Sequence, residues 1–271
     1  MKIAVIGCGN MGSAMINAWL VKKVCKVSDL IVFEKNSEKL AFLNSKIEER
    51  NSKPIVFEQD YSKLKKVDVI VLAIKPQDVS GVLENIKLHL SKKTIIISIV
   101  AGITIKRIES ILGNAKIVRS MPNMPAQISM GIVGWSSNSQ VKVSDKKLIA
   151  KLLGSMGYEI NFSDENKLDV VTAISGSGPA YVFYFMEALF EAGHKLGLTS
   201  EEATALAMGT FIGSSLMVNV SGESPKALRA KVTSKKGTTE AAITVFDKNN
   251  VKRIVNDAVK AAFLRAKQLN K

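Results

Sequence analysis

A glycine-rich segment near the start of the chain has the residue types and the spacing that bind a dinucleotide. Gly7, Gly9 and Gly12 form the pattern GxGxxG, with Asn10 and Met11 between the last two glycines. A short apolar run precedes the pattern and a helix-like stretch follows it, which is the context in which such glycines bind a pyrophosphate. The first glycine permits a tight turn, the second lets the backbone approach the phosphates, and the third allows the helix to pack closely on the strand. We therefore predict a dinucleotide site with its phosphates at the N-terminus of the helix.

Three polar residues at the end of the second apolar run bear on the choice of cofactor. Glu34 lies about 20 residues beyond the glycines, where a carboxylate accepts a hydrogen bond from the ribose 2′-hydroxyl and favours NADH. Lys35 and Asn36 follow it directly, and Lys35 could pair with the 2′-phosphate of NADPH. The two features conflict, so we predict a site that accepts NADH or NADPH. Simple solvent exposure of a charged strand end is the alternative.

Two later turns are also predicted to border the cofactor. The first contains Ala73, Lys75 and Pro76, and the second contains Ala101. Each follows an apolar, strand-like run, and ligands of doubly wound sheets bind beyond the carboxyl ends of the strands. Ordinary tight turns without a ligand would show the same residues.

The composition fits a globular protein of one or two domains. The chain has 271 residues, 46% of them hydrophobic and 23% charged. The net charge is +14, but the lysines are spread along the chain and no basic run alternates with aromatic residues. A solvated, lysine-rich surface is therefore favoured over a nucleic-acid site. Such a surface would still attract a polyanionic cofactor and a carboxylate substrate.

Membrane insertion, disulfides and a metal site are not expected. No apolar run approaches the roughly 20 residues that a membrane span needs. The two cysteines, Cys8 and Cys25, lie outside any CxxC pair, and two histidines leave little for a metal. Cysteine use of this kind is typical of a reducing compartment, so we expect a cytoplasmic protein.

The elements that must position these residues alternate between strand and helix in the first part of the chain. Short apolar runs alternating with helical stretches predict βαβ units and a mostly parallel, doubly wound sheet of the Rossmann type. The helical stretches include Met11–Val21 and Ser37–Asn51, and Gly131–Ser136 and Tyr158–Phe162 are candidates to extend the sheet. The predicted strands are Lys2–Ile6, Leu30–Glu34, Pro54–Phe57, Val67–Ala73, Thr94–Val100 and Ala115–Arg119.

After about Asp164 the pattern becomes helical, which predicts a first domain over residues 1–163 and a second over 164–271. Thr199 and Glu202 form a capping box at the start of one helix, and Ser224 precedes a proline at the start of another. An all-helical domain of this size is small to stand alone, so we expect it to bury its surface in a homodimer. The other predicted helices cover Asp169–Leu196, which is interrupted by a Gly-Ser-Gly-Pro sequence, Thr238–Phe246 and Val251–Leu269.

Six segments together resemble the Δ1-pyrroline-5-carboxylate reductase family from end to end. The first motif is shared by many dehydrogenases, whereas the combination of the last three is specific. In order, the segments are GCGNMG at Gly7–Gly12, AIKP at Ala73–Pro76, VAG at Val100–Gly102, RSMPNMPA at Arg119–Ala126, SGSGPAY at Ser175–Tyr181, and Pro225–Asp247, which contains VTSKKGTT at Val232–Thr239.

The resemblance implies NAD(P)H-dependent reduction of Δ1-pyrroline-5-carboxylate to L-proline, the last step of proline biosynthesis. It also implies a helical domain that intertwines with its twin as a homodimer, or as an assembly of such dimers, and that contributes a substrate loop across the dimer. Ser234, Gly237 and Thr238 would bind the substrate carboxylate, and Thr239 would be the catalytic residue at the ring nitrogen. The nicotinamide side would be lined by Met121, Pro122 and Asn123.

The residues of the substrate loop support the same interpretation. The loop precedes a helix, whose free backbone N–H groups form a cradle for a carboxylate. A plain helix cap made by Thr238 or Thr239 is the alternative. Lys235 and Lys236 depart from the family, which usually has proline and glycine here. If that glycine has a positive φ, Lys236 is strained by roughly 1 kcal/mol.

Two other functions remain as alternatives. A β-hydroxyacid dehydrogenase would need a catalytic lysine on the first long helix of the second domain, but Ser175–Glu187 contains none and Lys195 comes later. A non-catalytic NAD(P)-binding protein would be compatible with the altered loop.

Overall fold

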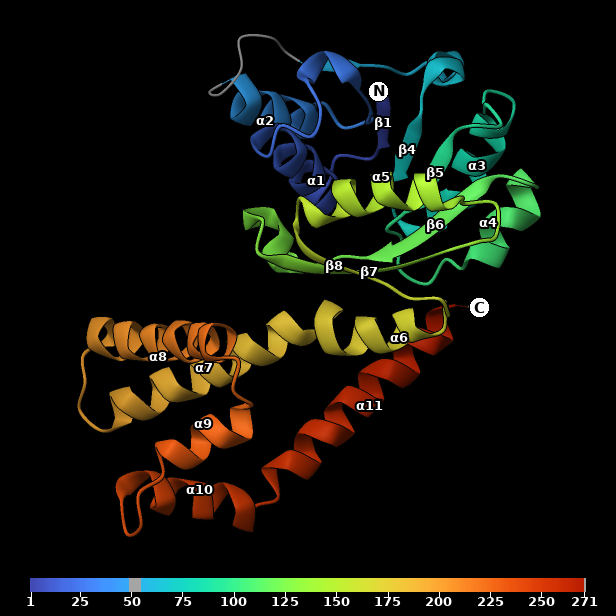
Figure 1. The fold of residues 1–271 in the computed structure, drawn as a ribbon. Coiled ribbons are helices and arrows are strands. Elements are labelled where there is room, and N and C mark those ends of the chain that lie inside the picture. The colour runs from blue at the N-terminus through green and yellow to red at the C-terminus, as the bar shows by residue number, and fades with distance from the viewer. Residues whose placement is uncertain (49–54, 271) are drawn as a thin grey trace. The chain divides into compact units, whose positions relative to one another are not determined.

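The computed structural model of the chain describes residues 1–48 and 55–270. It divides into two compact units (Figure 1). The sheet unit comprises Met1–Ser177 and Ala262–Lys271, and the helical unit comprises Gly178–Ala261. The predicted domain boundary between residues 163 and 164 stays a prediction. The sheet unit extends farther because Leu168 and Ala173 are buried in it and Val171 packs against Gly134.

The sheet unit contains an eight-stranded sheet in the order β3-β2-β1-β4-β5-β6-β7-β8. β6 and β7 pair antiparallel, and the other described pairs are parallel. The order changes direction between β1 and β4, as it does in dinucleotide-binding sheets, and this confirms the predicted fold class. The strands are β1 Ile3–Ile6, β2 Leu30–Phe33, β3 Val56–Phe57, β4 Val69–Leu72, β5 Ile95–Ser98, β6 Lys116–Met121, β7 Gly131–Ser137 and β8 Gly157–Asn161.

Helices cover both faces of this sheet, which is why its central strands are apolar throughout. Ile3 and Val5 of β1 belong to one core cluster, whereas Ala4 and Ile6 belong to another. Successive residues of a strand point to opposite faces, so the two clusters lie on opposite sides of the sheet. The first includes residues of α1 (Asn10–Val21), α2 (Ser37–Glu48) and α5 (Val143–Gly154), and the second includes residues of α3 (Val79–Lys87) and α4 (Ile105–Leu112).

The predicted long helix from Asp169 to Leu196 is formed in three pieces. α6 (Lys167–Val171) leads into a π-helical turn at Thr172–Gly176, and α7 (Gly178–Lys195) follows. The end of the predicted helix Ser37–Asn51 and the start of the predicted strand Pro54–Phe57 lie outside the described residues.

The helical unit consists of α7, α8 (Ser200–Ser221), α9 (Pro225–Lys231), α10 (Thr238–Lys248) and the first part of α11 (Val251–Leu269). Both predicted caps are present. The Thr199 hydroxyl accepts a hydrogen bond from the Glu202 N–H at 3.2 Å, and the Glu202 carboxylate accepts one from the Thr199 N–H at 2.9 Å. The Ser224 hydroxyl accepts one from the Ala227 N–H at 3.2 Å.

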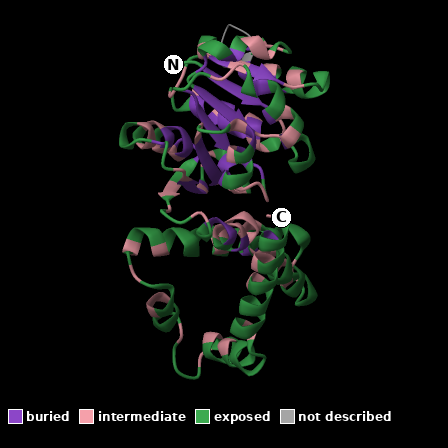
Figure 2. Cartoon of the chain, turned by 90° about the vertical axis from the view of Figure 1, so that its right-hand side faces the viewer, coloured by how far each residue is buried: buried purple, intermediate pink, exposed green. Residues whose placement is uncertain are grey.

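The helical unit has almost no core of its own. Among its described residues, Ala203 and Ala207 alone are buried (Figure 2). Exposed apolar side chains are frequent on α8, among them Ile212, Leu216 and Met217. By length and composition α8 is also long and apolar enough to cross a membrane. The sequence analysis expected no such helix. One such helix is weak evidence for a membrane, because other apolar helices pass the same test.

Candidate active site

The glycine turn after β1 requires glycine at two of its positions. Gly7 has φ +94°, and a Cβ atom added to it would lie 2.4 Å from the carbonyl oxygen of Ala73. A Cβ atom on Gly12 would lie 2.3 Å from the carbonyl oxygen of Gly7. Gly9, the N-cap of α1, has open space around it and provides no capping side chain. The first N–H groups of α1, from Asn10 onward, can therefore bind an anion.

Glu34 braces the glycine turn from the end of β2. One carboxylate oxygen accepts a hydrogen bond from the N–H of Cys8 at 3.0 Å, and the other accepts from Lys35 and Asn36 at 2.9 and 3.1 Å. Burial alone would raise the pKa of Glu34, but these hydrogen bonds and the charge of Lys39 lower it below its ordinary value. The carboxylate is thus held ionised by backbone N–H groups.

A cavity of about 230 Å³ adjoins the turn and is lined by residues of both α1 and α2. Asn10, Lys39 and Gln127 are among its polar residues. Lys39 was not among the predicted site residues, although it lies only three positions beyond Asn36. It places a cation beside the cavity and close enough to Glu34 to affect its pKa. Cys8 also lines the cavity, and burial followed by the charge of Glu34 raises its pKa to about 11, so the thiol is neutral.

The other predicted cofactor residues lie beyond the carboxyl ends of neighbouring strands. Ala73 follows β4, and its N–H donates to the carbonyl of Ile6 at 2.8 Å. Lys75 and Pro76 start the next turn. Ala101 follows β5, beside Gly102, which has φ +74°. These two segments and the glycine turn after β1 thus lie along one edge of the sheet.

The segment after β6 is fixed by packing on both sides. Met121 is the last residue of β6, and its methyl group would lie 3.1 Å from a Cβ atom added to Gly176 of the π-helical turn. Pro122 follows, and the Asn123 side chain accepts a hydrogen bond from the N–H of Ile132 at 2.9 Å.

Ser175, in the same π-helical turn, was not among the predicted site residues. Its hydroxyl oxygen is buried and has no hydrogen-bond partner among the described residues. A buried hydroxyl without a hydrogen-bond partner is unfavourable, so its presence calls for a structural or functional explanation. Turns of π-helix are frequent at functional sites. No metal cluster of three or more His, Cys, Asp or Glu side chains is found in the described part of the chain.

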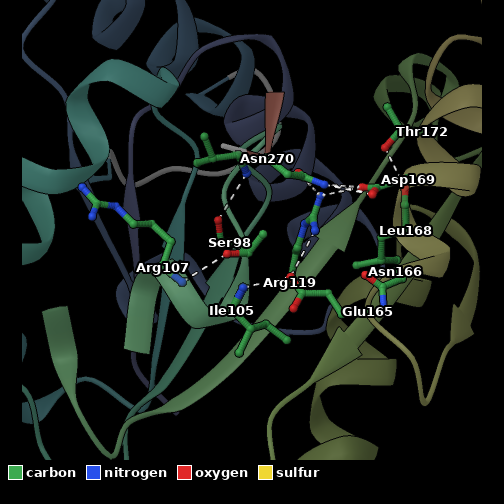
Figure 3. Close-up of polar contacts among 12 residues, drawn as sticks. Ser98, Ile105, Arg107, Arg119, Glu165, Asn166, Leu168, Asp169, Thr172 and Asn270 are labelled. Carbon is green, nitrogen blue, oxygen red and sulfur yellow. Dashed lines mark hydrogen bonds and ion pairs between the residues drawn. The ribbon is translucent and has the colours of Figure 1, made fainter. Parts of the chain in front are cut away.

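A buried polar cluster beyond β5 and β6 was also missed by the sequence analysis. Arg119 of β6 donates to Glu165 at 3.0 Å and to Asp169 at 3.2 Å (Figure 3). It also donates to the side-chain oxygen of Asn270 at 3.0 Å. The Asn270 amide in turn donates to both oxygens of Asp169, at 2.8 and 2.9 Å. Arg119 and Asn270 are 151 positions apart, so no local pattern could connect them.

The predicted substrate loop lies in the helical unit, before α10. Gly237 is the N-cap of α10, so neither Thr238 nor Thr239 makes the cap that was the alternative interpretation. The N–H of Gly237 donates to the carbonyl of Ser234 at 3.0 Å. A Cβ atom on Gly237 would lie 2.3 Å from the Ser234 hydroxyl oxygen. Thr238 and Thr239 form the first turn of the helix, where backbone N–H groups are available to an anion.

Lys236 has a left-handed conformation, which is the condition under which the sequence analysis expected it to be strained. Its φ is +59°. Its N–H donates to the Glu240 carboxylate at 2.7 Å, which holds the loop against the first turn of α10.

Comparison with known proteins finds two domain families. Residues 165–269 match the family described as pyrroline-5-carboxylate reductase dimerisation, and residues 2–102 match the family described as NADP oxidoreductase, coenzyme F420-dependent. The pyrroline-5-carboxylate reductase of Pseudomonas aeruginosa is 36% identical over 269 residues, which cover 99% of this chain and 96% of that protein. That of Aquifex aeolicus is 34% identical over 273 residues, which cover 99% of this chain and 97% of that protein.

Two solved structures have the same fold along the whole chain. The pyrroline-5-carboxylate reductase of Coxiella burnetii has a TM-score of 0.91 and 35% identity, and the match covers 100% of this chain and 98% of that one. The Plasmodium falciparum pyrroline carboxylate reductase, solved with NADP bound, has a TM-score of 0.87 and 32% identity, with the same coverage.

Proposed function

The chain belongs to the pyrroline-5-carboxylate reductase family, and we infer that it reduces Δ1-pyrroline-5-carboxylate to L-proline with NADPH or NADH, as the last step of proline biosynthesis. The observation that carries this inference is the match with reductases over the full length, together with a glycine turn built for a dinucleotide. A hydride is added to the imine carbon and a proton to the ring nitrogen, so the imine is reduced and the dinucleotide is oxidised. The bound dinucleotide supplies the hydride.

In the proposed site the protein holds the dinucleotide along the carboxyl edge of the sheet. Gly7, Gly9, Gly12 and the N–H groups of Asn10 and Met11 would hold the pyrophosphate. The uncapped N-terminus of α1 supports this role. Residues of the next four segments would line the adenosine and nicotinamide portions, namely Glu34, Lys35, Asn36, Ala73, Lys75, Pro76, Ala101, Met121, Pro122 and Asn123.

We propose that NADPH is preferred over NADH. Glu34 already accepts three backbone hydrogen bonds, so it acts mainly as a brace for the turn. Lys35 and Lys39 bring two cations to the end of β2 and the start of α2, where a 2′-phosphate would be bound. These contacts and charges support binding of the 2′-phosphate.

The substrate is held by the loop before α10. Its carboxylate is bound by Ser234, Gly237 and Thr238, and the first N–H groups of α10 supply backbone donors. Thr239 orients the ring nitrogen through its hydroxyl and relays a proton from water, because a threonine hydroxyl is too weak an acid to protonate the imine by itself.

The helical domain associates with a second copy, as its family description indicates. We propose a homodimer, alone or within an assembly of dimers, in the cytoplasm. The match to a dimerisation family includes all of α8, so a partner subunit explains its exposed apolar residues without a membrane.

The direct test is oxidation of NADPH by the purified protein when Δ1-pyrroline-5-carboxylate is added. We expect loss of nicotinamide absorbance and an equal amount of L-proline. Adding a 3-hydroxy acid together with the oxidised cofactor tests the β-hydroxyacid dehydrogenase alternative by the same absorbance measurement. Cofactor binding without turnover of either substrate would favour a non-catalytic NAD(P)-binding protein.

A further inference from the structure

In the cluster around Arg119 the charged groups are buried, and their hydrogen-bond donors are matched to acceptors. Arg119 and Asp169 are 6% and 3% exposed. A buried ion pair is stable only when further hydrogen bonds satisfy the atoms that the pair leaves open. Asn270 provides them: its oxygen accepts from Arg119 while its nitrogen donates to Asp169 (Figure 3). A neutral amide therefore bridges both members of the pair.

The cluster also connects β6 to the start of α4. Arg119 lies in β6, two positions before Met121. Glu165, which accepts from Arg119, also accepts from the N–H of Ile105 at the start of α4 at 2.8 Å. The segment between β5 and α4 is thereby connected to β6.

The end of α11 contacts the same segment from another direction. A Cβ atom added to Gly102 would lie 2.5 Å from the carbonyl oxygen of Leu269, so the backbone of the turn packs directly on the last residue of α11. Asn270 follows immediately. Residues 269 and 270 therefore hold both the turn that contains Ala101 and the strand that leads to Met121.

From these contacts we propose that Asn270 is a positioning residue for hydride transfer. It does not touch the reacting atoms. It locks the buried Arg119–Asp169 pair and so keeps Ala101 and Met121 in place against the nicotinamide. The proposal rests on the proposed function, in which both residues line the bound cofactor. A small displacement of a cofactor wall is costly, since misplacement by about 1 Å can reduce the rate about 100-fold.

The test compares Asn270→Ala with Gln268→Ala. Gln268 is an exposed amide near the same helix end, and its side-chain oxygen accepts a hydrogen bond from Arg265 at 3.2 Å. We expect Asn270→Ala to lower kcat by about 10- to 100-fold per active site, with a much smaller change in the KM for NADPH. The deuterium isotope effect on kcat, measured with cofactor deuterated at the transferred position, should rise because hydride transfer becomes slower. Gln268→Ala should match the wild type.

A swapped pair separates positioning from simple loss of stability. Asn270→Asp places a second carboxylate beside Asp169 and removes a donor, so it should be at least as damaging as Asn270→Ala. Combining it with Asp169→Asn restores one carboxylate and one amide around Arg119. The double variant should recover kcat and the normal isotope effect relative to either single variant. Recovery would support the proposal even if the single variants fold poorly.

Three results distinguish the possible failures. An unchanged kcat and isotope effect per folded site in Asn270→Ala would overturn the positioning role, even if the variant melts at a lower temperature. Lack of any turnover by the wild type would instead count against the proposed function. In that case the emission of bound NADPH still reports the surroundings of its nicotinamide, and identical emission from wild type and Asn270→Ala would overturn the proposal without an activity assay.

Discussion

At the scale of single residues, Thr239 is the side chain whose proposed role can be separated most cleanly from binding. It lies in the first turn of α10, whereas the predicted dinucleotide residues lie in the sheet unit. Thr239→Ala should therefore lower kcat, by roughly 10-fold for a lost orienting hydroxyl, and leave the KM for NADPH nearly unchanged. Thr244→Ala removes an exposed hydroxyl from the same helix and is the matched control. Equal kinetics for Thr239→Ala and the control would remove Thr239 from the site.

Glu34→Gln should make the stability of the protein less dependent on pH. Burial opposes ionisation of Glu34, but hydrogen bonds from Cys8 and Asn36 and the charge of Lys39 lower its pKa below the ordinary 4.5. A group with a lowered folded pKa stabilises the fold fully above its unfolded pKa, and this stability is lost as the pH falls through the folded pKa. The free energy of unfolding should thus fall more steeply below pH 4.5 in the wild type than in the variant.

Urea unfolding at several pH values would measure this difference. Glu38→Gln, which neutralises an exposed carboxylate in the first turn of α2, is the control and should keep the wild-type slope. If Glu34→Gln also kept that slope, the carboxylate would not be the brace that its hydrogen bonds indicate.

At the scale of elements, the strands were predictable and the long-range polar contacts were not. Buried parallel strands are apolar throughout, so runs such as Ile95–Ser98 stand out between glycines and charged residues. The GxGxxG turn was also predictable, because its conformation demands glycine at Gly7 and leaves no room for a side chain at Gly12. Arg119 and Asn270 are 151 positions apart, and neither has a local pattern that predicts a partner.

The loop before α10 allows strain and charge to be tested separately at Lys236. A left-handed φ of +59° costs a residue with a side chain roughly 1 kcal/mol relative to glycine. Lys236→Gly removes both this strain and the charge, whereas Lys236→Ala removes the charge alone. We therefore expect Lys236→Gly to be more stable than the wild type by roughly 1 kcal/mol, and Lys236→Ala to gain much less.

The charge of Lys236 should appear in the salt dependence of substrate binding. Attraction between an exposed lysine and a carboxylate is screened by salt, so the wild-type KM for the imino acid should rise with ionic strength. Both Lys236 variants should lose part of this dependence, while the KM for NADPH should respond as in the wild type. The same salt response in all three proteins would show that the charge does not assist binding.

At the scale of the whole molecule, the two units differ in how they are stabilised. The sheet unit buries two apolar clusters between its strands and helices. The helical unit buries Ala203 and Ala207 alone among its described residues, although apolar side chains such as Ile212 and Leu216 lie exposed on it. Large exposed apolar surfaces mark sites of association. We therefore expect the helical unit to require a second copy of the chain to complete its core.

This requirement predicts that stability and activity depend on protein concentration. Folding coupled to association follows mass action, so the unfolding temperature should rise when the protein is concentrated. Specific activity should fall on dilution into the range where sedimentation shows monomers.

A basic protein of net charge +14 also binds anionic surfaces, so vesicle flotation must be done at high salt. If α8 inserted into a membrane, the protein would float with neutral vesicles under those conditions; we expect it to remain a dimer in solution. A fully active monomer, with an unfolding temperature independent of concentration, would contradict the partner-completed core.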